Sequence, residues 1–107
     1  MMINVTYSRR DTTLTVKGHA LAAPKGKDLI CAAASILAFT VLEIAEENAE
    51  KFLPSVLMEN DSADFRIVCN PSDGQLGRCR DMLDTVFTGF EILANEYPDY
   101  VRVTKEE

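Results

Sequence analysis

The feature that most constrains this chain of 107 residues is an almost unbroken apolar run over residues 29–45. The run is too long for a strand, and it predicts a helix over residues 29–51. Its length approaches that of a membrane span, but Asp28 precedes it and Glu43 lies within it. We therefore expect a helix that is central and buried in a globular fold, because its first turns are apolar on nearly every side.

The segments around this run alternate between apolar and polar residues. Segments 3–7 and 12–18 predict one β-hairpin, and segments 55–58 and 63–69 predict a second one after the helix. A strong turn then leads to a second amphipathic helix, and residues 100–104 form a final strand. The apolar stripe of that helix consists of Leu76, Cys79, Met82, Leu83, Val86, Phe87, Phe90, Leu93, Ala94 and Tyr97. The order ββαββαβ predicts an α+β fold, a mixed sheet packed with two helices.

Length and charge predict one globular domain over residues 1–107 and restrict its partners. The net charge of −6 argues against direct binding of nucleic acid, which needs clustered lysines and arginines. An acidic protein is instead suited to a basic protein or peptide. No basic segment followed by an apolar one opens the chain, and three cysteines do not make a closed disulfide framework. Both features favour a cytoplasmic protein.

A cysteine and the chain's one histidine form the candidate catalytic pair. His19 lies at the end of the second predicted strand, and Cys31 lies in the first turn of the apolar helix. With Asp28 as N-cap, a thiolate at Cys31 gains up to about 2 kcal/mol from the helix dipole and its unpaired N–H groups. An imidazolium partner stabilises it further. Gly18 has no side chain, which allows another group to approach the chain closely beside His19. These residues predict a cysteine nucleophile if sulfur and imidazole meet.

Each of these residues also has a simpler structural interpretation. A cysteine in an apolar helix is most often a small buried side chain, and Gly18 can merely end a strand. Asp28 is first of all a cap, whose charge opposes thiolate formation, although it could orient His19 or a substrate amide. Ser35, one turn after Cys31 on the same face, bonds back to a helix carbonyl or donates to the thiolate or substrate.

The remaining cysteines, Cys69 and Cys79, fall on apolar faces and are most simply core residues. No metal site is expected, because no two cysteines have the close spacing of a zinc knuckle.

Two short motifs surround the candidate nucleophile: Gly18-His19-Ala20 and Gly26-Lys27-Asp28-Leu29-Ile30-Cys31-Ala32-Ala33-Ala34-Ser35. At this spacing they closely resemble the signature of the ribosomal-processing cysteine protease family, called Prp, and the resemblance extends over the whole chain. It implies a cytoplasmic, homodimeric endopeptidase that removes the N-terminal extension of large-subunit ribosomal protein twenty-seven, a basic protein, by cutting after an aromatic residue.

The resemblance also implies a role for each matched residue. Cys31 is the nucleophile and His19 the base, while Gly18, Asp28 and Ser35 have supporting roles. No metal or organic cofactor is needed. The segment between the pair corresponds to a flexible loop that orders around substrate, here Ala22, Ala23, Pro24, Lys25 and Gly26.

We further expect backbone N–H groups at the helix start to form the oxyanion hole. Two other functions stay open from the residues alone. One is a non-enzymatic ribosome-assembly or peptide-binding module, in which Cys31 is packing. The other is a thiol redox sensor that uses Cys31 with Cys69 or Cys79.

Overall fold

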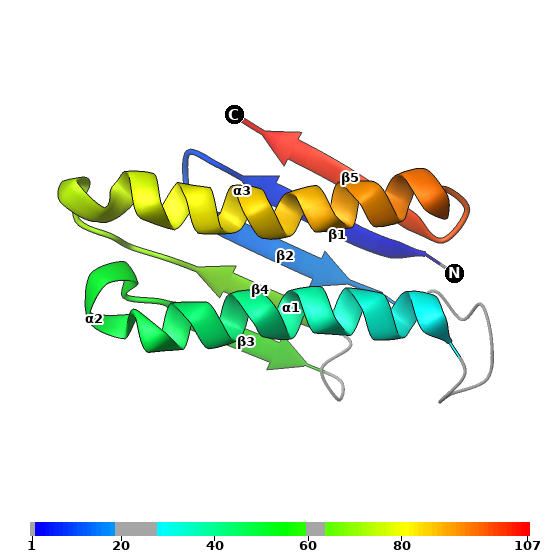
Figure 1. Ribbon diagram of the computed structural model, residues 1–107, viewed down its shortest axis with the longest axis horizontal. Helices are drawn as coiled ribbons and strands as arrows, with labels where there is room; N and C mark the ends of the chain where they lie inside the picture. The colour runs from blue at the N-terminus through cyan, green and yellow to red at the C-terminus, as the bar shows by residue number, and fades with distance from the viewer. Residues whose placement is uncertain (1, 19–27, 60–63) are drawn as a thin grey trace.

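Two long helices cover one face of a five-stranded mixed sheet in the computed structural model, which describes residues 2–18, 28–59 and 64–107 (Figure 1). The predicted α+β class and element order are confirmed, with one short helix added. The elements are β1 (Ile3–Ser8), β2 (Thr13–Lys17), α1 (Leu29–Glu47), α2 (Ala49–Phe52), β3 (Ser55–Glu59), β4 (Asp64–Val68), α3 (Asp73–Glu96) and β5 (Val101–Glu106).

The predicted helix over residues 29–51 breaks at Asn48, which separates α1 from α2. The Asn48 side-chain amide donates to the carbonyl of Ile44 at 2.9 Å, and its backbone N–H is shared among the last carbonyls of α1. An asparagine side chain that competes for backbone partners in this way favours helix ends over helix interiors.

The strand order β3-β4-β2-β1-β5 joins the two predicted hairpins at the middle of the sheet. β2 pairs antiparallel with β1 on one side and with β4 on the other, while β5 returns parallel to β1. Antiparallel pairing therefore places the end of β2 between the start of β1 and the start of β4. This position matters because the chain leaves β2 there toward the candidate histidine.

The core lies between the sheet and the helices. Alternate strand residues, among them Val5, Tyr7, Leu14, Phe65 and Ile67, are buried on the helix side, as the period of two in a strand requires. The predicted apolar stripe of α3 faces them and supplies seven buried residues: Cys79, Met82, Leu83, Val86, Phe87, Phe90 and Leu93.

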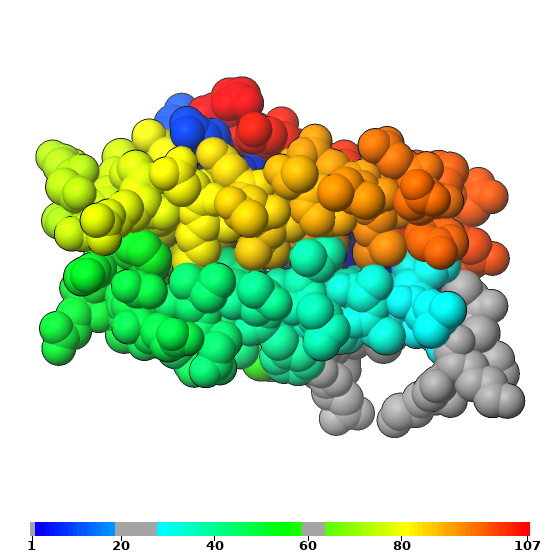
Figure 2. Space-filling model, in the orientation of Figure 1, coloured from blue at the N-terminus to red at the C-terminus, as the bar shows by residue number. Residues whose placement is uncertain are grey.

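The expectation that the first helix is central and buried is wrong. Its buried residues are Ile30, Ala34, Val41 and Ala45, whereas Leu29 is 78% exposed. α1 and α3 lie side by side over the sheet (Figure 2), so each is covered beneath and along one flank only. Its outer face therefore stays uncovered whatever its composition. By length and composition α1 would also suffice to cross a membrane, a test that core helices of globular proteins pass as well.

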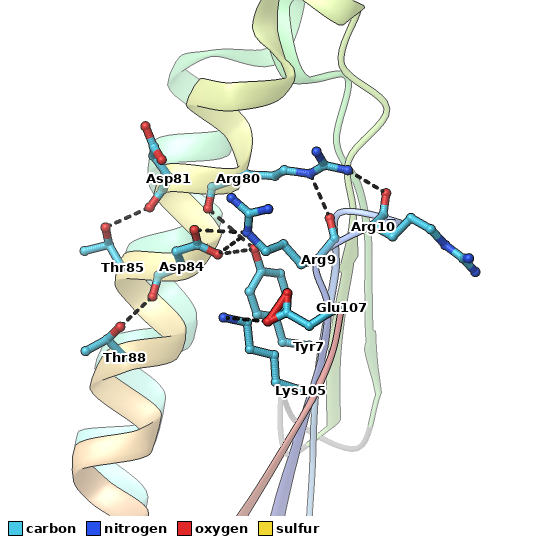
Figure 3. Close-up of polar contacts among 10 residues, drawn as sticks. All are labelled: Tyr7, Arg9, Arg10, Arg80, Asp81, Asp84, Thr85, Thr88, Lys105 and Glu107. Atoms are coloured by element: carbon cyan, nitrogen blue, oxygen red, sulfur yellow. Dashed lines mark hydrogen bonds and ion pairs between the residues drawn. The ribbon is translucent and has the colours of Figure 1, made fainter.

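A polar network fixes α3 at the end of the sheet where β1 turns into β2 (Figure 3). The hydroxyl of Tyr7 donates to Asp84 Oδ1 at 2.7 Å, and Arg9 Nε donates to the same oxygen at 3.2 Å. Arg80 Nε donates to the Arg9 carbonyl at 3.0 Å. Burial and the hydrogen bond to Asp84 raise the pKa of Tyr7. These bonds tie α3 to the sheet far from the end of β2.

Candidate active site

The first turn of α1 is closed by the predicted N-cap, Asp28. Its Oδ1 accepts from the backbone N–H of Ile30 at 3.1 Å and of Cys31 at 3.0 Å, and its carbonyl accepts from the N–H of Ala32 at 3.1 Å. The capping role of Asp28 is thus confirmed. The cap holds the first turn of α1, which carries Cys31, because it satisfies N–H donors that the helix itself leaves unpaired.

The same contacts bear on the oxyanion hole expected from backbone N–H groups at the helix start. Asp28 already accepts from three of these donors, the N–H groups of Ile30, Cys31 and Ala32. The physical reason is that a capping carboxylate and an oxyanion seek the same unpaired donors. An acyl oxygen at this position would have to displace the carboxylate from the Cys31 N–H.

Helical spacing places Cys31 on a different flank of α1 from Leu37, the residue that packs on α3. Leu37, on the other flank, packs so closely on α3 that a Cβ added at Gly89 would collide with it. Cys31 is partly buried and packs against the edge of the core, so its sulfur lies at the boundary between core and solvent. Ser35, one turn further on the same flank, is exposed. A substrate that reaches Cys31 therefore meets Ser35 as well.

The other two cysteines are core residues, as expected. Cys69 is 3% exposed and Cys79 is 0% exposed. The hydrogen bond of the Cys69 thiol to Cys79, together with burial, raises the pKa of Cys69. A protonated, enclosed thiol is a poor nucleophile. Among the described residues, no group of three histidine, cysteine or acidic side chains could hold a metal ion.

Gly18 marks the point where the chain leaves β2. It has a φ of +94°, and a Cβ at this position would overlap the carbonyl oxygen of Met2. Its N–H donates to Asp64 Oδ1 at 3.0 Å. The sequence singled out Gly18 but not Asp64, because a contact across 46 positions depends on which strands pair. Composition and spacing give no signal for it.

The candidate base and the substrate loop lie outside the described residues: His19, Ala22, Ala23, Pro24, Lys25 and Gly26. The end of β2 and the start of α1, between which that segment runs in the sequence, lie at the same end of the molecule (Figure 1). The structure therefore places the candidate nucleophile, while the pairing of Cys31 with His19 stays a prediction.

A shallow cavity of about 430 Å³ opens on the sheet face opposite the helices. Polar strand residues that alternate with the core residues line most of it, including Asn4, Thr6, Thr15 and Arg66. Because Cys31 lies on the helix layer, this cavity is not the place where its sulfur would meet a substrate.

Comparison with known proteins gives consistent results. The family described as cysteine protease Prp matches residues 2–102. The ribosomal processing cysteine protease Prp of Mycoplasma pneumoniae is 30% identical over 105 residues, which cover 94% of this chain and 91% of that protein.

Solved structures share the fold. Crystal structures of an essential ribosomal processing protease Prp from S. aureus match with a TM-score of 0.83 and 23% identity, in complex with a covalently linked product peptide, and 0.77 and 21%, with a substrate peptide. Each match covers 98% of this chain and 100% of the other. A Streptococcus mutans protein matches with a TM-score of 0.76 and 18% identity, over 99% of this chain and 98% of that one.

Proposed function

The chain belongs to the Prp family of cysteine proteases, and on that premise we propose that it removes the N-terminal extension of large-subunit ribosomal protein twenty-seven, with Cys31 as nucleophile and His19 as base. The name of the M. pneumoniae relative, a ribosomal processing protease, supports a ribosomal protein as substrate. The observation that carries the assignment is access: Cys31 is partly exposed in the first turn of α1, whereas Cys69 and Cys79 are buried.

The proposed reaction is acyl transfer through a thioester. The imidazole of His19 takes the proton of the Cys31 thiol, and the sulfur attacks the carbonyl carbon of the scissile bond. The C–N bond breaks, and the leaving amine takes the proton from the imidazolium. His19 then deprotonates a water molecule that attacks the thioester, which releases the carboxylic acid and restores the thiol. No step calls on a metal or an organic cofactor.

Asp28 and Ser35 support this reaction from the helix. By holding the N–H of Cys31 at 3.0 Å, the carboxylate of Asp28 fixes the turn that presents the sulfur. A bound acyl group competes with that carboxylate for the N–H, so substrate binding is coupled to a shift of Asp28. Ser35 lies where the peptide passes along the flank of α1 and can donate a hydrogen bond to it.

The charge of the protein supports a basic substrate. The net charge is −6, and the second half of α1 and the helix that follows expose Glu43, Glu46, Glu47 and Glu50. An acidic surface raises the rate at which a basic ribosomal segment arrives, and added salt weakens the effect. A ribosomal substrate and unpaired thiols both fit the cytoplasm.

We further propose that the chain forms a homodimer through the outer face of α1. This face exposes Leu29, Ile36 and Phe39 in its first half and acids in its second half. Two copies paired antiparallel about Ile36 bury these apolar side chains against one another. The acidic half of each helix then lies beside the dipole-positive start of its partner.

Cleavage of a peptide that spans the extension and the start of the mature ribosomal protein tests the proposed reaction by mass spectrometry. We expect Cys31→Ala and His19→Ala to abolish cleavage while circular dichroism shows an unchanged fold. The matched control is Cys69→Ala with Cys79→Ala, which removes two thiols and should keep cleavage. Activity in either Cys31→Ala or His19→Ala contradicts the pair. Loss of activity in the folded control favours the redox sensor, and intact bound peptide without product favours a binding module.

A further inference from the structure

The end of β2 is held from both sides, although the strand pairing stops short of it. β2 pairs with β1 as far as Lys17, opposite Asn4, and with β4 as far as Val16, opposite Phe65. Gly18 lies beyond both ladders, so its backbone N–H needs another partner. The first residue of β4 supplies it, because Asp64 Oδ1 accepts from this N–H at 3.0 Å.

The opposite side of Gly18 is closed by the start of β1. A Cβ at Gly18 would overlap the carbonyl oxygen of Met2, so the bare backbone fits against that peptide. The φ of +94° suits glycine and is strained for other residues. Gly18 therefore sits between Met2 and the carboxylate of Asp64, in a conformation with positive φ.

The Asp64 carboxylate bonds to the Gly18 amide although two cationic side chains lie nearby. Asp64 shares the sheet-face cavity with Lys17 and Arg66, two cations that would suit an ion pair. Within the described part of the chain, the structure records no ion pair between Asp64 and either of them. The carboxylate instead makes a charge-assisted hydrogen bond to a main-chain amide, a stronger bond than a neutral acceptor makes.

We propose that Asp64 is a positioning residue for His19, the base assigned in the proposed function on which this inference rests. Glycine is the most flexible residue, so an unheld Gly18 would let the following peptide, which belongs to His19, swing freely. The hydrogen bond to Asp64 holds the peptide plane that enters Gly18, and the Met2 carbonyl confines Gly18 from the other side, so the backbone that leads to His19 starts from a fixed point. A misplacement of about 1 Å costs about 100-fold in rate, so a distant carboxylate can control catalysis without touching substrate.

Two variants at Asp64 separate the acceptor from the charge. Asp64→Ala removes the acceptor; we expect kcat to fall by about 10- to 100-fold with KM within about twofold. Asp64→Asn keeps an oxygen acceptor without the charge and should restore kcat to within about threefold. Asp81→Ala, which removes an exposed carboxylate from α3, is the charge control and should keep wild-type kcat.

Amide hydrogen exchange reports on the anchor independently of any substrate. We expect the Gly18 amide to exchange faster in Asp64→Ala than in wild type, and at nearly the wild-type rate in Asp64→Asn, while the thermal midpoint moves little. The rate at which iodoacetamide alkylates Cys31 should follow the same order, because the thiolate depends on the placement of His19.

The outcomes distinguish this inference from the proposed function. The positioning role of Asp64 is overturned if Asp64→Ala keeps the wild-type kcat, the wild-type rate of Cys31 alkylation and the wild-type exchange rate of the Gly18 amide. It is also overturned if Asp64→Asn is as impaired as Asp64→Ala. If His19→Ala keeps wild-type cleavage and alkylation, the proposed function fails instead. If His19→Ala is inactive while Asp64→Ala is fully active, the pair stands and the positioning role is wrong.

Discussion

Gly18 is the residue whose identity the backbone dictates most strictly. Its φ of +94° and its contact with Met2 leave no room for a side chain. We expect Gly18→Ala to lower the free energy of unfolding by about 1–3 kcal/mol from backbone strain, with a further loss from the collision. Urea unfolding measures this, and the cleavage rate should fall with it.

The matched control is Gly77→Ala in the interior of α3. A Cβ at Gly77 meets nothing within 4 Å, and a helix interior favours alanine over glycine by about 0.5–1 kcal/mol. This variant should therefore be more stable than wild type. A Gly18→Ala protein as stable as wild type would show that the strain at the end of β2 is relieved by movement of the first residues of β1.

Residues of the site could be predicted from the sequence where their role is local. The cap at Asp28 and the place of Cys31 in the first turn were predicted correctly, because a cap and the first turn of a helix lie within a few positions of each other. Asp64 was missed because its partner, Gly18, lies across a strand pairing that alternation alone does not specify. His19 was recognised as the chain's one histidine, and its placement stays a prediction.

At the scale of the element, the two long helices differ in how they begin. Asp28 caps α1 through two side-chain hydrogen bonds, whereas Ser72 precedes α3 without a side-chain capping bond. We expect Asp28→Ala to destabilise the protein by about 1 kcal/mol, the typical cost of a lost cap. Ser72→Ala should change the unfolding free energy by much less. Equal losses in thermal or urea unfolding would contradict the capping role of Asp28.

The hydrogen bond between Tyr7 of β1 and Asp84 of α3 makes the free energy of unfolding depend on pH in the alkaline range. Burial and Asp84 raise the pKa of Tyr7, so the folded state holds this proton more tightly than the unfolded state. The resulting stabilisation is fully present below the unfolded-state pKa of about 10 and is lost as the pH rises above it. Urea unfolding at neutral pH and near pH 11 should show this fall.

Tyr7→Phe separates the contribution of the Tyr7 hydroxyl group from that of the packing of its ring. The variant keeps the ring, which lies 5.3 Å from that of Phe87, and loses the hydrogen bond to Asp84 at a cost of about 1 kcal/mol near neutral pH. Its stability should fall less steeply than that of wild type above pH 10. A remaining slope is expected from Cys69, whose pKa is raised as well. Parallel profiles for wild type and variant would contradict the role of Tyr7.

The helices also show which element properties a sequence encodes. Most of the α3 stripe was predicted correctly because polar residues mark the side that stays in solvent. Tyr97, also placed on the stripe, is 42% exposed and follows the last residue of the helix. α1 carries no such mark: it is apolar around most of its circumference, and its composition does not say how many of its sides are covered. Only the arrangement of two helices on one sheet face decides that Ile36 is exposed.

At the scale of the whole molecule, the candidate site and the polar network around Tyr7 lie at opposite ends of the sheet. The start of α1 and the end of β2, which flank the candidate pair, lie at one end (Figure 1). The bonds of Tyr7 and Arg9 to Asp84 of α3, and of Arg80 to the Arg9 carbonyl, lie at the other end, where β1 turns into β2. The attachment of α3 is therefore remote from the start of α1 and the end of β2.

The apolar outer face of α1 leads to a prediction about assembly. A face with Ile36 at 67% exposure is costly to leave in water, and pairing two copies of α1 removes it from solvent. We expect light scattering to show a dimer for wild type and a monomer for Ile36→Asp, because the antiparallel pairing brings the two copies of this residue together. Ile92→Asp provides the matched control, since Ile92 is 59% exposed on α3, outside the proposed interface. A wild-type monomer at tens of micromolar, or an Ile36→Asp dimer, would rule out this interface.

Dimerisation should also make the unfolding midpoint of wild type rise with protein concentration, because mass action stabilises a folded state that associates. The unfolding midpoint of Ile36→Asp should not change with protein concentration.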